Sequence, residues 1–213
     1  MSKQPRFADR RDAGRCLAAE LSDYAHRSDT VVLGLPRGGI PVAAEVAEAL
    51  DAPLEVFVVR KLGVPGHEEL AMGAIASGGV RVLNEDVVLA SAIEPVEVNR
   101  VTERELETLN RQEVAYRGDR APTEVRDRVA IVVDDGLATG ATMRAAVTAL
   151  RELGARRIVV AVPTAPRETC QALSELADEV VCVTSPHPFM AVGLWYADFA
   201  PVSDEAVREL LGP

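Results

Sequence analysis

VAIVVDDGLATGATMRAA, residues 129 to 146, joins an apolar run, two adjacent carboxylates and a loop of small residues. Five apolar residues precede Asp134 and Asp135, and the loop Ala138 to Thr142 then opens a helix-forming segment. Small residues let an anion come close to the chain, and backbone N–H groups at a helix start point toward it. We therefore predict that this turn binds a sugar phosphate. The loop and its threonine hydroxyls would contact the phosphate, and the carboxylates would contact sugar hydroxyls, directly or through a hydrated metal ion.

A purely structural interpretation of this turn is the main alternative. An aspartate before a helix is often only an N-cap, and glycine is common in strand-to-helix turns. Two adjacent like charges at a strand end, however, lower stability unless solvent, a cation or a ligand receives them. The segment is not a P-loop, because no Gly-Lys-Ser/Thr sequence ends it and it holds no lysine. The binding interpretation requires an open turn and two acids that are not tied up in internal ion pairs.

Outward from this turn, short apolar runs alternate with helix-like segments. Four further runs predict buried strands: Thr30 to Leu35, Leu54 to Val59, Arg157 to Val162 and Glu179 to Val183. Three segments predict helices: Ile40 to Leu50, Ala141 to Leu153 and Arg167 to Leu176. This order predicts an α/β fold with an open, mostly parallel sheet flanked by helices. Ligands of such sheets bind beyond the carboxyl ends of the strands.

Two stretches depart from this alternation. Arg60 to Val88 contains five glycines and short apolar pieces, which favours a hairpin or flexible loop over a helix. Glu97 to Tyr116 is rich in charge and carries apolar residues at helical spacing, which predicts a helix with one buried stripe. We expect a single domain over residues 1–213, with its core at about 28–183, the flexible loop at about 60–88 and a small hood at about 184–200.

The composition limits the partners and the location of the chain. A formal net charge of -10 repels nucleic acid and anionic lipid, so we expect neither as a partner. The three cysteines Cys16, Cys170 and Cys182 show no metal-ligand pattern and are interpreted as reduced thiols, mostly in the core. The start of the chain lacks the apolar segment of a secretory signal, and no run approaches the roughly 18 residues of a membrane span. A cytoplasmic protein is expected.

Val129 to Thr142 closely resembles the phosphoribosyl pyrophosphate motif of type I phosphoribosyltransferases. That motif is a hydrophobic strand, two acidic residues and a small-residue loop that ends in a hydroxyl residue. The resemblance implies that Asp134 and Asp135 hold the ribose 2- and 3-hydroxyls and, through water, a Mg²⁺ ion. It also implies that the 5-phosphate of 5-phosphoribosyl 1-pyrophosphate (PRPP) binds at Ala138, Thr139, Gly140, Ala141 and Thr142.

A second segment, GLPRGG from Gly34 to Gly39, corresponds to the pyrophosphate loop of this family. Arg37 can donate a charge-assisted fork to pyrophosphate oxygens, and Gly38 and Gly39 expose backbone N–H groups. In the family this loop often contains a non-proline cis peptide, so we expect one between Pro36 and Arg37. A plain strand-to-helix turn with a solvated arginine is the alternative.

A third family feature is a flexible loop that closes over the reacting centre and excludes water. Arg60 to Gly79 occupies the corresponding place, and from it Arg60 and Lys61 could reach the departing pyrophosphate. His67, Glu68 and Glu69 are candidates for proton transfer, although side chains of a solvated loop are the more common meaning of such residues.

Ser185 to Phe199 resembles the base-binding hood of hypoxanthine-guanine phosphoribosyltransferases, in which an aromatic residue stacks on the purine. Phe189 is the corresponding base-binding candidate here, with ordinary packing as an equal alternative, and Trp195 and Tyr196 are assigned to the core or to a subunit contact. The spacing in the hood differs from the family pattern. The aspartate that faces the purine in 6-oxopurine enzymes is replaced by Ala138, so the catalytic acid or base is not identified.

The resemblance implies a Mg²⁺-dependent phosphoribosyltransferase. Such an enzyme moves the phosphoribosyl group from PRPP to a nitrogen nucleophile, most simply a nucleobase, and releases pyrophosphate. Arg37 and Lys61 would stabilise the leaving group while Asp134 and Asp135 fix the sugar, and a homodimer is expected because family members commonly form one. The alternatives are a non-catalytic regulator that senses PRPP and an unrelated α/β phosphatase or hydrolase. The acceptor, whether purine, pyrimidine or another amine, stays open.

Overall fold

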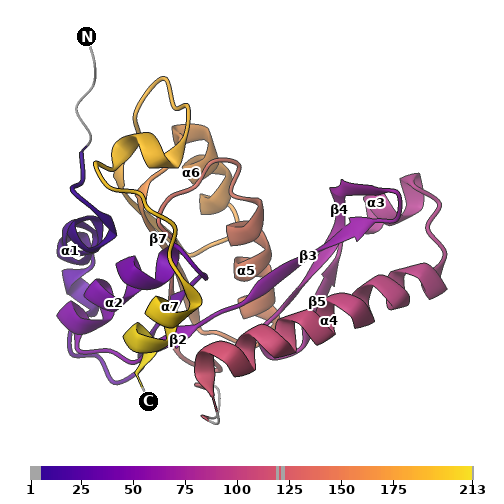
Figure 1. Ribbon diagram of the computed structural model, residues 1–213, viewed down its shortest axis with the longest axis horizontal. Helices are drawn as coiled ribbons and strands as arrows, with labels where there is room; N and C mark the ends of the chain where they lie inside the picture. Colours follow the sequence, from indigo (N-terminus) through magenta and orange to yellow (C-terminus); the bar gives the residue numbers. More distant parts are fainter. Residues whose placement is uncertain (1–5, 119, 121–122, 213) are drawn as a thin grey trace.

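A computed structural model describes residues 6–118, 120 and 123–212. Its core is a five-stranded sheet in the order β2-β1-β6-β7-β8, with every neighbouring pair parallel (Figure 1). The strands are β1 Thr30–Gly34, β2 Leu54–Val56, β6 Val129–Val133, β7 Arg157–Thr164 and β8 Glu179–Thr184. The predicted parallel sheet is therefore confirmed. Strand β2 is shorter than the apolar run Leu54 to Val59, because from Val59 onward the chain belongs to a second sheet.

Helices cover both faces of this sheet because successive side chains of a buried strand point to opposite sides. In β6, Ala130 and Val132 pack toward helices α5 and α6, whereas Val129, Ile131 and Val133 pack toward α1 and α2. The four helices are α1 Arg10–Glu20, α2 Gly39–Leu50, α5 Ala141–Glu152 and α6 Arg167–Ser174. All five residues of β6 are buried, which is why this strand appears in the sequence as an unbroken apolar run.

A second unit, here called the arm, projects to one side of the core (Figure 1). It consists of an antiparallel sheet in the order β3-β4-β5 and two helices. Its elements are β3 Val59–Val64, β4 His67–Ala76, β5 Val80–Leu83, α3 Glu85–Ala90 and α4 Pro95–Arg117. Val98, Val101 and Leu109 of α4 are buried in one cluster with Leu62 and Met72 of the sheet. The predicted hairpin and the predicted helix with one buried stripe are both confirmed.

The segment after β8, here called the hood, covers residues 185–203 and is joined to the start of the chain. It contains the 3-10 helix η2 Val192–Trp195 and leads into helix α7 Asp204–Leu211. The N–H of Phe7 donates to the carbonyl of Trp195 (3.0 Å), and the N–H of Ala197 donates to the carbonyl of Phe7 (2.8 Å). Helices α1, α3 and α7, and the short 3-10 helix η1 Ser22–Tyr24, were not predicted.

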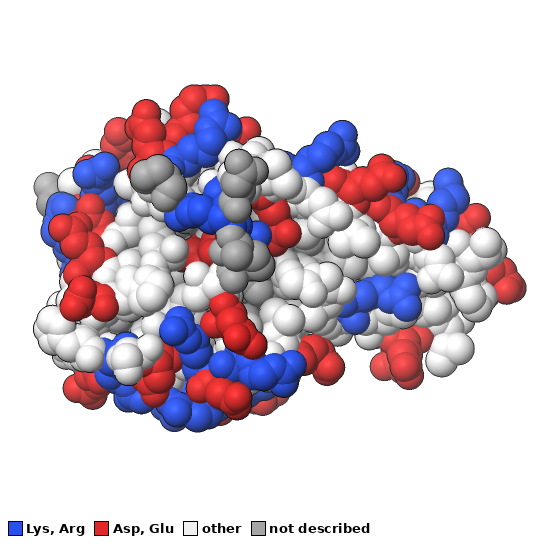
Figure 2. Space-filling view, turned by 90° about the horizontal axis from the view of Figure 1, so that it is seen from below, with Lys and Arg blue, Asp and Glu red and all other residues white. Residues whose placement is uncertain are grey.

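Two features of the surface bear on the expected partners. Within the described ranges, no helix combines the length and the apolar character needed to cross a bilayer. On the face seen in Figure 2, acidic and basic side chains are interspersed and no continuous basic stripe crosses the surface. The three cysteines are all free, but each is half-buried rather than fully inside the core.

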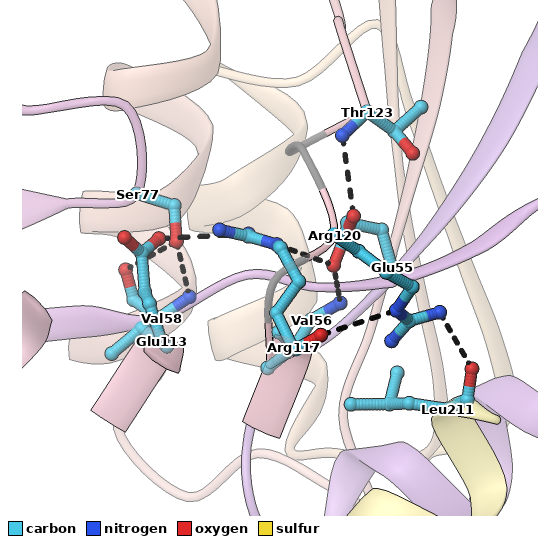
Figure 3. Close-up of polar contacts among 9 residues, drawn as sticks. All are labelled: Glu55, Val56, Val58, Ser77, Glu113, Arg117, Arg120, Thr123 and Leu211. Atoms are coloured by element: carbon cyan, nitrogen blue, oxygen red, sulfur yellow. Dashed lines mark hydrogen bonds and ion pairs between the residues drawn. The ribbon is translucent and has the colours of Figure 1, made fainter. Parts of the chain in front are cut away.

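A buried ion pair fixes the root of the arm to the core (Figure 3). Glu55 on β2 and Arg117 at the end of α4 are 7% and 9% exposed, and Arg117 Nε donates to Glu55 Oε1 at 3.2 Å. The N–H groups of Val56 and Thr123 also donate to the Glu55 carboxylate, at 2.9 and 3.2 Å. A second carboxylate, on Glu113, lies 3.6 Å from Arg117 Nη2. One guanidinium therefore offsets the charge of two covered carboxylates.

The same network reaches the end of the chain that the structure describes. Arg120 donates to the backbone carbonyl of Arg117 (3.2 Å) and to that of Leu211 in α7 (2.9 Å), as Figure 3 shows. The end of α4 is thus connected both to the sheet edge and to α7. Because β3 follows β2 directly, these contacts set the direction in which the arm leaves the core.

We predict that Arg117→Met destabilises the chain by about 3–5 kcal/mol, because it leaves two buried carboxylates without a cation. The measurement is urea unfolding followed by circular dichroism. Arg100→Met is the matched control, since Arg100 lies on the same helix and pairs with Glu97 at the surface, where its side chain is 68% exposed. That control should change stability by no more than about 0.5 kcal/mol. Equal losses in the two variants would contradict the role given to the buried pair.

Candidate ligand-binding site

The acidic pair and the glycine loop meet because β1 and β6 are neighbouring parallel strands. Gly34 at the end of β1 is in register with Val133 at the end of β6, so the loops after both strands start at the same level. Gly38 lies so close to the Asp135 carboxylate that an added Cβ would stand 2.1 Å from Oδ2. A side chain at this position is excluded, and the absence of one is what lets the two loops touch.

The loop Ala138 to Thr142 is open to solvent. Ala138, Thr139 and Ala141 are exposed, Thr142 is half-buried and Gly140 is covered. Gly140 has a φ of 71°, which a residue with a side chain adopts only under strain, and it starts α5 with no side-chain cap from any described residue. The Thr169 hydroxyl donates to the carbonyl of Ala138 (2.9 Å) and holds the loop from behind. The turn is therefore not filled by side chains, and the first N–H groups of α5 lack a side-chain acceptor.

Each carboxylate of the pair uses one oxygen within the protein and keeps the other. Asp134 Oδ1 accepts from the N–H of Asp135 (2.9 Å), and Asp135 Oδ2 accepts from Arg10 Nε (2.8 Å). No N–H or hydroxyl of a described residue donates to Asp134 Oδ2 or Asp135 Oδ1, and neither oxygen is among the polar atoms sealed from solvent. One oxygen of each residue is left for a ligand.

Arg10 is a residue of this site that the sequence did not reveal. Its ion pair with Asp135 has side-chain exposures of only 12% and 15%. The pair departs from the expectation that both acids are free of internal ion pairs, although it engages one oxygen only. The contact joins residues 125 positions apart, and nothing in the local pattern around Arg10 distinguishes it from the neighbouring arginines. The packing of α1 on the core and the pairing of the chain start with the hood together bring it here.

Burial disfavours the charged form of both carboxylates. The pKa of Asp134 is raised well above its usual range, first by burial and then by repulsion from Asp135. Burial also raises the pKa of Asp135, while the hydrogen bond from Arg10 acts in the opposite direction. Shifts of this kind, at the end of a strand beside an open loop, are typical of groups that await a cation or a ligand.

The pyrophosphate loop has the predicted backbone form, because the peptide bond between Pro36 and Arg37 is cis. Arg37 is exposed, lies 3.8 Å from Asp204 and faces a cavity of about 590 Å³ that is also lined by Arg60 and Arg111. Arg60, a candidate for contact with pyrophosphate, instead donates twice to Glu105 on α4, at 2.6 and 2.9 Å. Its charge is thus already offset within the arm.

Lys61 lies on the other side of the arm sheet. It is exposed and lines a small cavity of about 160 Å³ together with Ala141 and Arg144 of α5. The structure therefore brings Lys61 to the start of α5, next to the loop, and not into the cavity of Arg37. His67, Glu68 and Glu69 are exposed around the β3–β4 turn, at the end of the arm that lies far from the core in Figure 1.

In the hood, Tyr196 contacts the acidic pair and Phe199 contacts Arg10, while base stacking by Phe189 stays a prediction. Phe189 is half-buried in the segment between β8 and η2. The Tyr196 hydroxyl, in contrast, donates to the backbone carbonyl of Asp135, and the Phe199 ring stacks with Arg10. Tyr196 is 5% exposed, in agreement with its predicted place in the core, and Trp195 packs partly buried against the same cluster.

The free carboxylate oxygens of the acidic pair suit a Mg²⁺ ion that is held by only a few protein ligands. Mg²⁺ prefers hard oxygen ligands and is commonly held by one or two carboxylates together with substrate phosphates. Asp134 Oδ2 and Asp135 Oδ1 are two such oxygens. Within the described ranges, no group of three or more potential ligand residues is assembled. The carboxylates would share such an ion with a phosphorylated ligand or with water.

Known proteins similar to this chain carry the same domain. Residues 8–197 match the family described as phosphoribosyl transferase domain. Two curated proteins of Mycobacterium tuberculosis, each named "Putative phosphoribosyl transferase", are 48% identical over 205 residues, which is 96% of this chain and 46% of theirs. The chain thus spans about half the length of these relatives. The "Bifunctional protein PyrR" of Bacillus pumilus is 33% identical over 99 residues, covering 42% of this chain and 53% of that protein.

A solved structure shares the whole fold. The crystal structure of TT1426 from Thermus thermophilus superposes with a TM-score of 0.87 at 42% identity. The superposition covers 97% of each chain, so it includes the arm and the hood as well as the parallel sheet.

We predict that Asp134→Asn raises stability at neutral pH in magnesium-free buffer. A raised pKa in the folded state means that protonation favours folding, so the contribution of Asp134 is greatest below its usual pKa and is lost as pH rises through the shifted value. Asn keeps the acceptor for the N–H of Asp135 and carries no charge. The gain should reach about 1 kcal/mol or more at pH 8 and shrink toward pH 4.

Urea unfolding at several pH values checks this. Asp23→Asn, which changes an exposed carboxylate in the same way, is the control and should show no comparable pH-dependent gain. An Asp134→Asn chain that is less stable than wild type at pH 8 would show that this carboxylate is not an energetic cost to the fold.

Proposed function

Because the chain belongs to the phosphoribosyl transferase domain family, we propose that it transfers the 5-phosphoribosyl group of PRPP to a nitrogen nucleophile and releases pyrophosphate. The observation that carries this proposal is the pair of unused oxygens, Asp134 Oδ2 and Asp135 Oδ1, beside an open loop at the start of a helix. Two adjacent acceptors suit the two neighbouring hydroxyls of a ribose. The uncapped N–H groups suit its 5-phosphate.

The proposed binding mode assigns each segment one part of PRPP. Backbone N–H groups and hydroxyls of Ala138 to Thr142 hold the 5-phosphate, and Asp134 and Asp135 hold the sugar hydroxyls. Arg37, with the N–H groups of Gly38 and Gly39, receives the pyrophosphate. The contact between Gly38 and Asp135 supports this division, because the loop proposed for pyrophosphate touches a residue proposed for the sugar.

Catalysis in this proposal is electrostatic and positional. The bond from C1 to the pyrophosphate oxygen stretches ahead of attack, so negative charge grows on the leaving group and positive charge on the sugar. Arg37 stabilises the charge on the leaving group, and the acidic pair fixes the sugar so that the nucleophile meets C1 from the opposite face. Asp134 and Asp135 would hold a Mg²⁺ ion, and such an ion would supply further neutralisation of the leaving group.

The acceptor is proposed to be a nucleobase, with Phe189 of the hood as its stacking residue. Position 138, where 6-oxopurine enzymes of the family place an aspartate, is an exposed alanine, so this chain holds no carboxylate there to exchange a proton with the base. The expected homodimer also stays a prediction. The aromatic residues near Trp195 are largely covered within the chain, and the exposed apolar side chains of the hood are Met190 and Leu194.

A non-catalytic sensor of PRPP is the second candidate. It would use the same loop and the same acidic pair, so the binding site alone does not separate the two functions. The similarity to the Bacillus pumilus protein, whose name states two functions, makes this candidate worth a direct test. An enzyme releases pyrophosphate when an acceptor is present, whereas a sensor binds PRPP without turnover.

We predict that wild type binds PRPP in calorimetry when magnesium is present and binds it far more weakly in excess chelator. Asp134→Asn with Asp135→Asn should weaken binding and lower turnover by at least about 100-fold, because it removes both positioning carboxylates. Glu103→Gln with Glu107→Gln removes two exposed charges from α4 and is the matched control. Equal affinity in chelator would exclude the metal, and unchanged activity in the double Asp variant would exclude the acidic pair.

For the enzyme, we expect pyrophosphate release from PRPP to depend on at least one acceptor in a panel of purine and pyrimidine bases and simple amines. The measurement is a coupled pyrophosphate assay with the wild-type chain. Tight PRPP binding with no release across the panel would favour the sensor. Release of phosphate from simple phosphoesters, with no need for a nitrogen acceptor, would instead identify a phosphatase.

A further inference from the structure

Arg10 is held from three sides in a fixed position against the acidic pair. Its Nε donates to Asp135 Oδ2 at 2.8 Å, and its Nη1 donates to the carbonyl of Ala200 at 2.8 Å. Its guanidinium carbon lies 3.9 Å from the centre of the Phe199 ring, a stacking distance for arginine on an aromatic face. A long, flexible side chain is thereby reduced to one orientation.

The backbone that carries Arg10 is fixed as well. Asp9 caps helix α1 by accepting from the N–H of Asp12 (2.8 Å), so Arg10 is the first residue of a defined helix. Just before it, Phe7 is 1% exposed, and the carbonyl of Ala8 accepts from the N–H of Asp198 in the hood (2.9 Å). The segment at residues 6–10 and the hood therefore form one support, and both parts contact Asp135.

This support determines which oxygen of Asp135 is available. Oδ2 faces the guanidinium of Arg10 and lies against Gly38, while the Tyr196 hydroxyl holds the backbone carbonyl of the same residue. Rotation of the carboxylate would break the ion pair with Arg10. Oδ1 is thus left as the acceptor beside Asp134 Oδ2, with its direction already set.

Charge gives a second reason for an arginine here. The ligand of the proposed function is an anion, and two adjacent carboxylates without a counter-ion would repel it. Arg10 offsets one of these charges and occupies neither of the two oxygens that face the ligand.

We propose that Arg10 is a positioning residue of the sugar site: it orients Asp135 toward the ribose hydroxyls and lowers the repulsion between the acidic pair and an anionic sugar phosphate. This inference rests on the proposed function, because it assigns Asp135 to the sugar. It makes the start of the chain a functional part of the site and not only a cover of the sheet.

The alternative is that Arg10 only fastens α1 to the core. That helix is already anchored by Ala13, Leu17 and Ala18, which are at most 6% exposed. The two interpretations predict different effects of an Arg10 substitution on ligand affinity. A fastening residue affects all ligands alike through stability, whereas a positioning residue affects most strongly those that carry sugar hydroxyls.

The test compares Arg10→Gln with Arg10→Lys and with Arg15→Gln. Arg15 lies on the same helix, its side chain is 59% exposed, and its partners are the carboxylates of Asp12 and Glu45. Changing it removes the same charge without touching the acidic pair. Calorimetry with magnesium measures the affinity for PRPP and for inorganic pyrophosphate, and competition against PRPP ranks ribose 5-phosphate and 2-deoxyribose 5-phosphate.

We expect Arg10→Gln to weaken PRPP binding by about tenfold or more, as for the loss of a charge-assisted hydrogen bond. It should also reduce the preference for ribose 5-phosphate over its 2-deoxy form and weaken pyrophosphate binding by a smaller factor than PRPP binding. Arg10→Lys should recover part of the affinity, because it keeps the charge but not the fork. Arg15→Gln should match wild type for every ligand.

The possible results distinguish a failure of the role proposed for Arg10 from a failure of the proposed function. If wild type binds PRPP and Arg10→Gln binds it as well or better, with the same preference between the sugar phosphates, the role of Arg10 is overturned and the proposed function stands. If wild type itself binds no PRPP, the proposed function falls and the assignment of Arg10 falls with it. Should Arg10→Gln fail to fold, Arg10→Lys replaces it, and an unchanged sugar preference in that variant is the overturning result.

Discussion

The parallel pairing of β1 with β6 is the constraint on which the rest of the site depends. It brings the ends of two strands to the same level, so that the glycine loop after β1 and the acidic pair after β6 lie in contact. Every other group of the site is placed relative to that contact. The helix α5 starts just beyond it, the hood and the chain start close over Asp135, and the arm brings Lys61 to the start of α5.

The site is maintained at the expense of stability. Two buried carboxylates repel each other, and the fold offers one internal cation, Arg10, to one oxygen of one of them. The root of the arm differs in this respect, because there a single arginine, Arg117, lies close to the carboxylates of both Glu55 and Glu113. The two places differ in what balances the acids: at the arm root Arg117 lies close to both carboxylates, whereas the acidic pair keeps one oxygen of each residue without a donor among the described residues.

Sequence reasoning could find what is local and periodic. The apolar runs predicted all five core strands. The segment VAIVVDDGLATGAT predicted the loop Ala138 to Thr142, because all residues of this motif are contiguous in the sequence. It could not find Arg10, whose partner Asp135 is 125 residues away. Nor could it find the ion pair of Arg60 with Glu105, which depends on how the arm sheet packs against α4. For the same reason it could not find the contact of Tyr196 with the acidic pair, or that of Phe199 through Arg10.

The central claim is that the turn after β6 binds a sugar phosphate. A crystal structure of the chain with PRPP and magnesium tests it most directly. The account predicts the 5-phosphate on the backbone N–H groups of Ala138 to Thr142 and the sugar hydroxyls on Asp134 and Asp135, with Arg10 still bound to Asp135. Ligand density elsewhere on the molecule, with this turn left to solvent, would contradict it.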